Sequence, residues 1–203
     1  DIMEFSIKRS VQLTGLIFFI DSFTQSIYTA LYMAEASVPR QLLWGSEAIL
    51  FTLLAAFAGS AMMQAKQHYL AWSALTASAA LNVVQVSIGL ALFGPFFEAA
   101  GQVEELMPAA RSVVAFSFMV YNAAKVLLAL ALIQIALGRV SAGSTALGGI
   151  GAIVGLVALV SNIASTAAGR DVFGDLPLAG GSGVLATVLL ALFLLTLSDE
   201  DAQ

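Results

Sequence analysis

The sequence predicts an all-α membrane protein, a six-transmembrane-helix bundle with short loops. Of its 203 residues, 60% are hydrophobic and only 10% are charged, and the mean hydropathy is +0.94. A soluble domain is closer to half apolar and about a quarter charged. The apolar residues gather in runs of about twenty or more, the length that a helix needs to cross about 30 Å of hydrocarbon. These runs do not alternate with polar residues, as the strands of a membrane barrel do.

Six such runs divide the chain, and we expect a single transmembrane domain over residues 1–203. The predicted spans cover residues 11–33, 42–64, 69–93, 109–137, 144–168 and 178–197. The first run follows Lys8 and Arg9, as the apolar part of a signal peptide would. However, the small residues Ala34 and Ala36 lie too far beyond it for a cleavage site, so we interpret it as the first span.

The longest predicted connection runs from Gly94 to Pro108. It mixes apolar residues with the three acidic residues Glu98, Glu104 and Glu105. A short interfacial helix would rest its apolar side on the bilayer, whereas an ordinary acidic loop would extend into water. The sequence leaves both alternatives open.

Composition excludes several classes of site. The chain has no Cys and one His, His68, which excludes disulfides, thiolate metal ligands and multi-histidine metal sites within it. A net charge of −5 is not that of a nucleic-acid-binding protein. No Gly-x-Ser-x-Gly motif is present, and Asp21 has no second mid-membrane Asp. We therefore predict no metal and no cofactor, and we favour a non-enzymatic role, with acid–base chemistry by Asp21, Glu47 and Lys125 left open as an alternative. A retinal Schiff base on a lysine of the fourth span would be chemically reasonable, but six spans do not match the seven-helix photoreceptors.

The basic residues of the loops predict the orientation. Six spans place both termini on the same side. That side would carry four basic residues and the other side three: Lys8, Arg9, Lys66 and Arg139 against Arg40, Arg111 and Arg170. Because cytoplasmic loops are enriched in Lys and Arg, we predict a multi-pass protein of a cell (inner) membrane with both termini in the cytoplasm.

Two ionisable residues lie deep inside predicted spans. Asp21 is near the middle of the first span and Lys125 near the middle of the fourth. A charge at this depth costs about 2.5–3.5 kcal/mol on insertion scales, so it usually faces the bundle interior and a partner. We interpret the two residues as counter-ions or as partners of a ligand.

Further polar residues share helical faces with these charges. At a spacing of three and four residues, Gln25 and Tyr28 follow Asp21, and Asn122 precedes Lys125. The third span carries Asn82 and Gln85 at a similar depth, and Glu47 lies near the start of the second span, where it could instead complement the helix dipole. The predicted ligand- or ion-binding residues are Asp21, Gln25, Tyr28, Glu47, Asn82, Gln85, Asn122 and Lys125.

We therefore predict a mid-bilayer polar pocket that binds or transports a small molecule or ion, provided that the first, third and fourth spans are neighbours. Alternatively, the polar residues only hold helices together, and the protein is a non-catalytic lipid-binding or scaffold subunit of a membrane complex.

We expect the second, fifth and sixth spans mainly to pack against other helices. Small-residue spacings such as Ala55–Gly59 and Gly151–Gly155 favour close helix packing, within the bundle or in a homo-oligomer. The expected partners are membrane lipids and a small ligand, not nucleic acid.

Overall fold

Six long helices make up the computed structural model, which describes residues 6–34, 36–169, 171–174 and 176–197. The helices are α1 (Ile7–Met33), α2 (Arg40–Gln64), α3 (Tyr69–Gln102), α4 (Met107–Ser141), α5 (Thr145–Ala168) and α6 (Leu178–Leu195), with a 3-10 turn, η1 (Glu104–Leu106), between α3 and α4. No strand occurs among the described residues. The predicted all-α fold is confirmed, and α2 to α6 are each long and apolar enough to cross a membrane.

The first helix is the most polar one, and its polar residues point inward. Its side chains Ser10, Thr14, Asp21 and Gln25 are buried. The opposite face exposes apolar side chains, namely Leu16, Ile20, Phe23 and Ile27. A helix on the surface of a soluble protein has the reverse arrangement. The arrangement of α1 is therefore that of a helix whose outer face meets lipid.

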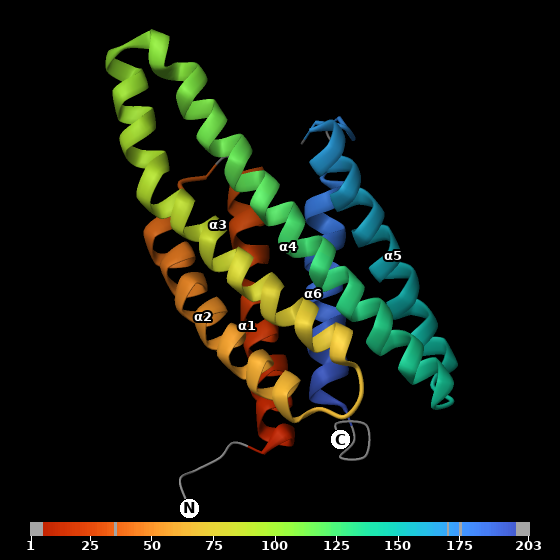
Figure 1. The fold of residues 1–203 in the computed structure, drawn as a ribbon. Helices are drawn as coiled ribbons and strands as arrows, with labels where there is room; N and C mark the ends of the chain where they lie inside the picture. Colours follow the sequence, from red (N-terminus) through yellow and green to blue (C-terminus); the bar gives the residue numbers. More distant parts are fainter. Residues whose placement is uncertain (1–5, 35, 170, 175, 198–203) are drawn as a thin grey trace, which may run out of the picture.

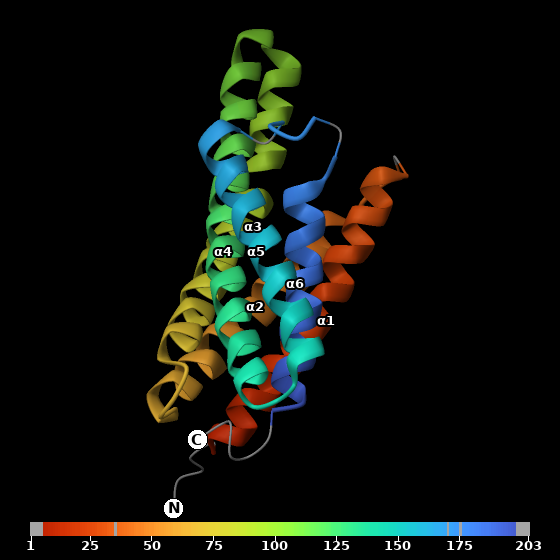
Figure 2. The same cartoon turned by 90° about the vertical axis from the view of Figure 1, so that its right-hand side faces the viewer.

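The helices form a ring in which α1 closes the circle against α6 (Figures 1 and 2). Contacts join α1 to α2, α2 to α3, α3 to α4, α4 to α6 and α6 back to α1, and α5 lies against α4 and α6. No Cα atom of α1 comes within 8 Å of a Cα atom of α3 or α4 in the described chain. The first, third and fourth spans are thus not backbone neighbours, and only side chains can join their polar faces.

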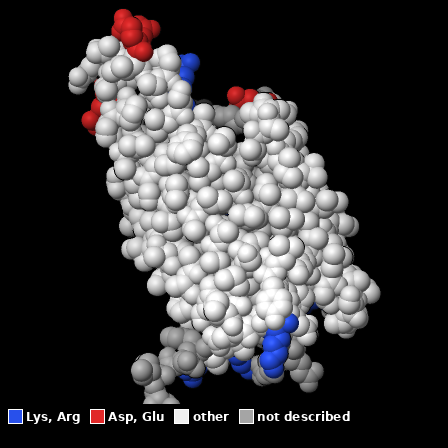
Figure 3. All heavy atoms as spheres, in the orientation of Figure 1, with Lys and Arg blue, Asp and Glu red and all other residues white. Residues whose placement is uncertain are grey.

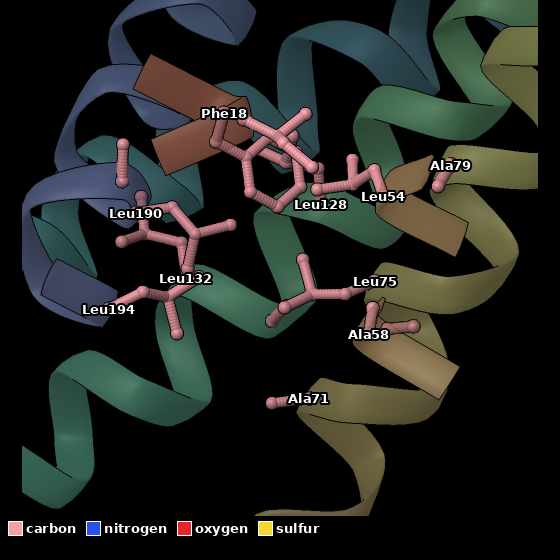
Figure 4. Packing of buried hydrophobic residues seen from close by; sticks show 14 of the residues in the cluster. Phe18, Leu54, Ala58, Ala71, Leu75, Ala79, Leu128, Leu132, Leu190 and Leu194 are labelled. Carbon is pink, nitrogen blue, oxygen red and sulfur yellow. The ribbon is translucent and has the colours of Figure 1, made fainter. Parts of the chain in front are cut away.

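Five helices of this ring supply the large side chains of the apolar core, and α5 adds the small residue Ala158. Phe18 of α1, Leu54 of α2, Leu75 of α3, Leu128 of α4 and Leu190 of α6 are buried together (Figure 4). Each lies on the side of its helix that faces the bundle axis. Burying them removes apolar area from contact with lipid rather than water, so close packing contributes more than the hydrophobic effect.

The glycines of α5 allow this helix to pack closely against α4 and α6. A Cβ atom on Gly148 would lie 2.7 Å from the backbone oxygen of Ala136, and one on Gly151 would lie 2.6 Å from the Phe193 ring. A Cβ atom on Gly155 would lie 2.7 Å from Ile133. The small-residue stripe of the fifth span is therefore covered by α4 and α6 within the bundle.

The segment predicted as the longest loop is largely helical. α3 continues through Pro95 to Gln102, and α4 begins at Met107. Their 34 and 35 residues correspond to about 50 Å each at 1.5 Å per residue. The α3–η1–α4 hairpin consequently projects beyond the ends of the other helices (Figures 1 and 2). The predicted break at residues 94–108 was wrong because α3 passes Pro95 while paired along its length with α4.

Charged side chains are confined to the two ends of the bundle and to its interior. The face in Figure 3 is white across its middle, with red groups at the upper end and blue groups at the lower end. We call the end where α1 begins and α6 ends the lower end. Its described charged residues are all basic: Lys8, Arg9, Lys66 and Arg139. The upper end carries Glu98, Glu104, Glu105 and Asp171 together with Arg40 and Arg111, and Arg170 lies outside the described residues.

Two adjacent glycines of α5 provide a test of this packing. We expect Gly148→Ala to destabilise the protein by about 1–3 kcal/mol, because the new methyl group meets backbone atoms of α4 that cannot rotate away. Gly149→Ala is the matched control, since a Cβ atom there has no neighbour within 4 Å and alanine favours the helix by up to about 1 kcal/mol. Thermal unfolding of the two variants in detergent measures the difference. Equal stability of both variants would contradict the close packing of α5 against α4 at Gly148.

Candidate functional site

Lys125 of α4 is the centre of a buried polar cluster. Its side chain is 1% exposed. The ammonium Nζ donates hydrogen bonds of 3.0 Å to Gln25 Oε1 of α1 and of 3.0 Å to Thr187 Oγ1 of α6. It also lies 5.2 Å from the centre of the Tyr121 ring, one turn earlier on α4, in cation–π geometry. One cation thus joins three helices through two neutral oxygen atoms and an aromatic face.

The length of the lysine side chain and a glycine make this geometry possible. Because the backbones of α1 and α4 are separated, the four-carbon stem of Lys125 spans the distance between them. The stem lies against Gly183 of α6, where a Cβ atom would be 3.2 Å from Lys125 Cδ. Thr187 donates its own hydroxyl proton to the Gly183 backbone oxygen at 2.8 Å, which leaves its oxygen lone pairs for the ammonium.

Asp21 of α1 is fully buried and has no hydrogen-bond partner. Its side chain is 0% exposed, and neither carboxylate oxygen accepts a hydrogen bond from any described group. Lys125 acts on it electrostatically but donates to Gln25 and Thr187 instead. A buried carboxylate without a partner is among the most costly groups that a protein can contain. Asp21 therefore either carries a proton or requires a positively charged partner.

Glu47 of α2 belongs to the same cluster. Its side chain is buried, next to Thr24 of α1, and it acts electrostatically on Asp21, Tyr121 and Lys125. It lies beyond the first turn of α2, which contains no acidic residue. The burial and the neighbours of Glu47 favour a place in the polar cluster over a role at the helix end.

The polar residues of α3 mostly join that helix to α4. Ser78 donates to the Ala124 backbone oxygen at 2.8 Å, and Gln85 Nε2 donates to Ser117 Oγ at 3.3 Å. Asn82 is buried and donates to the Ser78 backbone oxygen at 2.9 Å, while its own Oδ1 has no partner. Gln85 is half-buried in the α3–α4 contact, which fits a role in holding these two helices together.

An aromatic layer covers the cluster towards the upper end. Trp44 of α2 contacts the Tyr28 ring at 5.4 Å and the Phe93 ring at 5.6 Å between centroids. The Arg40 guanidinium lies 5.8 Å from the Trp44 ring. Gly89 of α3 makes room for the indole, because a Cβ atom there would collide with the Trp44 ring. We call Tyr28, Trp44 and Phe93 the aromatic roof.

An apolar floor seals the cluster towards the lower end. It lies about one turn from the charged residues and consists of Phe18, Phe51, Ala79, Leu128 and Leu190, all at most 2% exposed. A groove of about 330 Å³ lies elsewhere, near the lower end, and is lined by Arg9, Gln12, Leu13, Leu16 and Leu195. The polar cluster is thus closed from both sides, and this groove does not reach it.

The structure brings Asp21, Gln25, Glu47 and Lys125 into one cluster, although the backbones of their helices are not all adjacent. Asp21, Gln25, Glu47, Asn82, Asn122 and Lys125 are buried, whereas Tyr28 and Gln85 are half-buried. The sixth span was expected mainly to pack against other helices, yet α6 also supplies Thr187 to the cluster. Threonine is common in apolar helices, and only its four-residue spacing from Gly183 could have drawn attention to it.

The described residues contain no group of three or more His, Cys, Asp or Glu side chains that could hold a metal ion. The cluster instead combines two carboxylic acids, one amine and several neutral oxygen atoms. No family model, curated protein or solved structure matches this chain.

The threonine of α6 tests the arrangement around Lys125. We expect Thr187→Val, which keeps the shape and removes the acceptor, to destabilise the protein by about 1–3 kcal/mol, because the buried ammonium loses a hydrogen bond. Thr166→Val is the control, since that exposed hydroxyl bonds only within its own helix. Thermal unfolding compares the two variants. A cost at Thr166 as large as that at Thr187 would contradict the assignment.

The aromatic roof depends on the missing side chain of Gly89. We expect Gly89→Ala to displace the Trp44 indole and to expose it, which shifts its emission to longer wavelength. Tryptophan fluorescence in a Trp72→Phe background measures this shift. Gly59→Ala is the control, because a Cβ atom there meets Thr76 only at an ordinary 3.7 Å. An unchanged Trp44 spectrum in the Gly89 variant would show that the indole does not rest on this glycine.

Proposed function

We propose that the protein is an integral membrane protein whose buried polar cluster binds a small molecule or ion and carries it across the membrane. The helical, multi-pass architecture supports the membrane setting. The cluster lies inside the ring of helices, between the apolar floor and the aromatic roof. A ligand held there would be separated from both membrane faces, as expected of a carrier in a closed state.

The unpartnered carboxylate of Asp21 is the observation that carries the proposal. A cluster serving only to hold helices together would pair this group, because interhelical polar contacts stabilise only when both members are satisfied. Ser78 and Gln85 show such satisfied contacts between α3 and α4. Asp21 is as fully buried as Ser78 and has no such contact. Its acceptor atoms are what a bound ligand would complete.

The distribution of charge supports a proposal for orientation. Every described charged residue at the lower end is basic, whereas the upper end is mainly acidic. By the positive-inside rule, the lower end faces the cytoplasm, and the start of α1 and the end of α6 lie there. We propose the cell (inner) membrane as the location.

A lipid-binding or scaffold role is the second candidate. The groove at the lower end favours it, because Arg9 lies beside Leu13, Leu16 and Leu195, a combination that fits a lipid headgroup and its acyl chain. This role accounts for the outer surface but not for the interior charges. It predicts no ligand that depends on Asp21.

Changes at Asp21 and Lys125 test the proposed function. The purified full-length chain is unfolded thermally in the presence of a panel of monovalent and divalent salts, amines, amino acids and sugars. We expect at least one solute to stabilise the wild type, by about 2.7 kcal/mol at 100 times its Kd. Asp21→Asn should abolish this stabilisation, and Lys125→Met should alter it.

The double variant and a surface variant complete this test. Asp21→Asn combined with Lys125→Met should differ from the wild type in its response to that solute. Glu98→Gln, on the exposed hairpin, should respond as the wild type does. If no solute stabilises the protein, or if the double variant behaves as the wild type, the polar cluster is not a ligand site.

A further inference from the structure

We propose that the ligand of the polar cluster is a single monovalent cation, an alkali-metal ion or a small primary ammonium ion. Asp21 and Glu47 hold this cation, and Lys125 is a built-in cation that competes for the same carboxylates. This inference rests on the proposed function and specifies its substrate class. It is argued from the donors, the acceptors and the charges of the buried cluster.

The unsatisfied atoms of the cluster are acceptors. Asp21 offers two carboxylate oxygens, neither of which accepts a hydrogen bond from any described group. The strongest donor, the ammonium of Lys125, is already held by Gln25, Thr187 and the Tyr121 ring. An anion entering the cluster would therefore have to displace neutral partners of Lys125, whereas a cation meets free oxygen atoms.

The charges of the cluster also favour a cation as the ligand. Asp21, Glu47 and Lys125 are the ionisable groups that act on one another there, and Tyr121 faces them from α4. Two acids face one amine, so the state in which all three groups are ionised has a net charge of −1 and needs a counter-ion. One monovalent cation makes it neutral, which is the state favoured inside a bundle surrounded by lipid.

The donor set disfavours a divalent ion. Ca²⁺ takes six to eight oxygen ligands, usually with several carboxylates. No group of three or more acidic or imidazole side chains occurs in the described chain. Lys125 adds a positive charge that a divalent ion would have to approach. A monovalent ion requires less negative charge and is repelled less.

The competing role of Lys125 follows from its position between neutral and anionic partners. Its ammonium reaches Gln25 and Thr187 in this structure, yet Asp21 and Glu47 lie within its electrostatic range. The flexible stem rests on Gly183, which offers no side chain to fix it. When no cation is bound, the ammonium can turn towards the carboxylates. When a cation occupies them, it remains on the neutral oxygens.

The experiment measures cation binding by thermal unfolding of the full-length chain in detergent. Sodium, potassium, lithium and methylammonium chloride are titrated at fixed pH, with N-methylglucamine chloride holding the ionic strength constant. We expect at least one of these four cations to stabilise the wild type with saturation. Asp21→Asn should remove the effect, Glu47→Gln should weaken it, and Glu98→Gln should leave it unchanged.

The variants of Lys125 test whether the charge of this lysine competes with the bound cation. Removing the competing charge with Lys125→Met should lower the half-saturating cation concentration by about tenfold or more, since it abolishes a repulsion at short range. Lys125→Arg keeps the charge and should not lower it. An ion that only supports the fold would not bind more tightly when a buried charge is deleted.

Three results would overturn the inference: saturation that survives Asp21→Asn, stabilisation by lower pH with no response to any of the four cations, or weaker cation binding in Lys125→Met. A neutral or anionic solute that depends on Asp21 would also overturn it while leaving the proposed function intact. If no solute of any class binds, both proposals fail together.

Discussion

The buried ammonium of Lys125 is the interaction on which the interior of this bundle depends. A cation in a protein surrounded by hydrocarbon must find its partners within the protein. Lys125 finds them on α1 and α6, and in doing so it joins α1 to α4, whose backbones do not touch. The remaining requirements follow from this bond. Gly183 must lack a side chain so that the lysine stem fits beside α6. Thr187 must donate its proton to its own helix, which leaves its oxygen for the ammonium. Gln25 must lie on the buried face of α1.

The same constraint explains the layering of the bundle along its axis. Polar side chains from α1, α2, α3 and α4 occupy one level, which shields them from lipid on every side. Phe18 and Leu128 close this level below, and Trp44 closes it above. The outer surface is apolar in the middle and charged only at its ends (Figure 3). Polarity therefore decreases from the centre outward, the opposite of a soluble bundle, because lipid rather than water is the outer solvent.

Sequence reasoning predicted the helices and the depth of the charges more successfully than their partners. Twenty-residue apolar runs identify spans because hydrocarbon thickness sets their length, and Asp21 and Lys125 stand out within such runs because charges there are rare. The order of helices around the ring could not be predicted, since it depends on contacts between distant segments. Thr187 was missed because a threonine in an apolar helix carries no signal of its own. The helical continuation past Pro95 was missed because pairing with α4 overrides a local break.

The two seals of the polar cluster differ in construction, which under the proposed function bears on where a ligand would enter. The floor consists of fully buried side chains from five helices, so opening it would disrupt the core shown in Figure 4. The roof is a few ring contacts around Trp44, resting on Gly89 and including the half-buried Tyr28. The described charges at the upper end are mainly acidic, which would concentrate cations there. Under the proposed function, we therefore expect a ligand to enter past Trp44, where few contacts separate the cluster from the mainly acidic upper end.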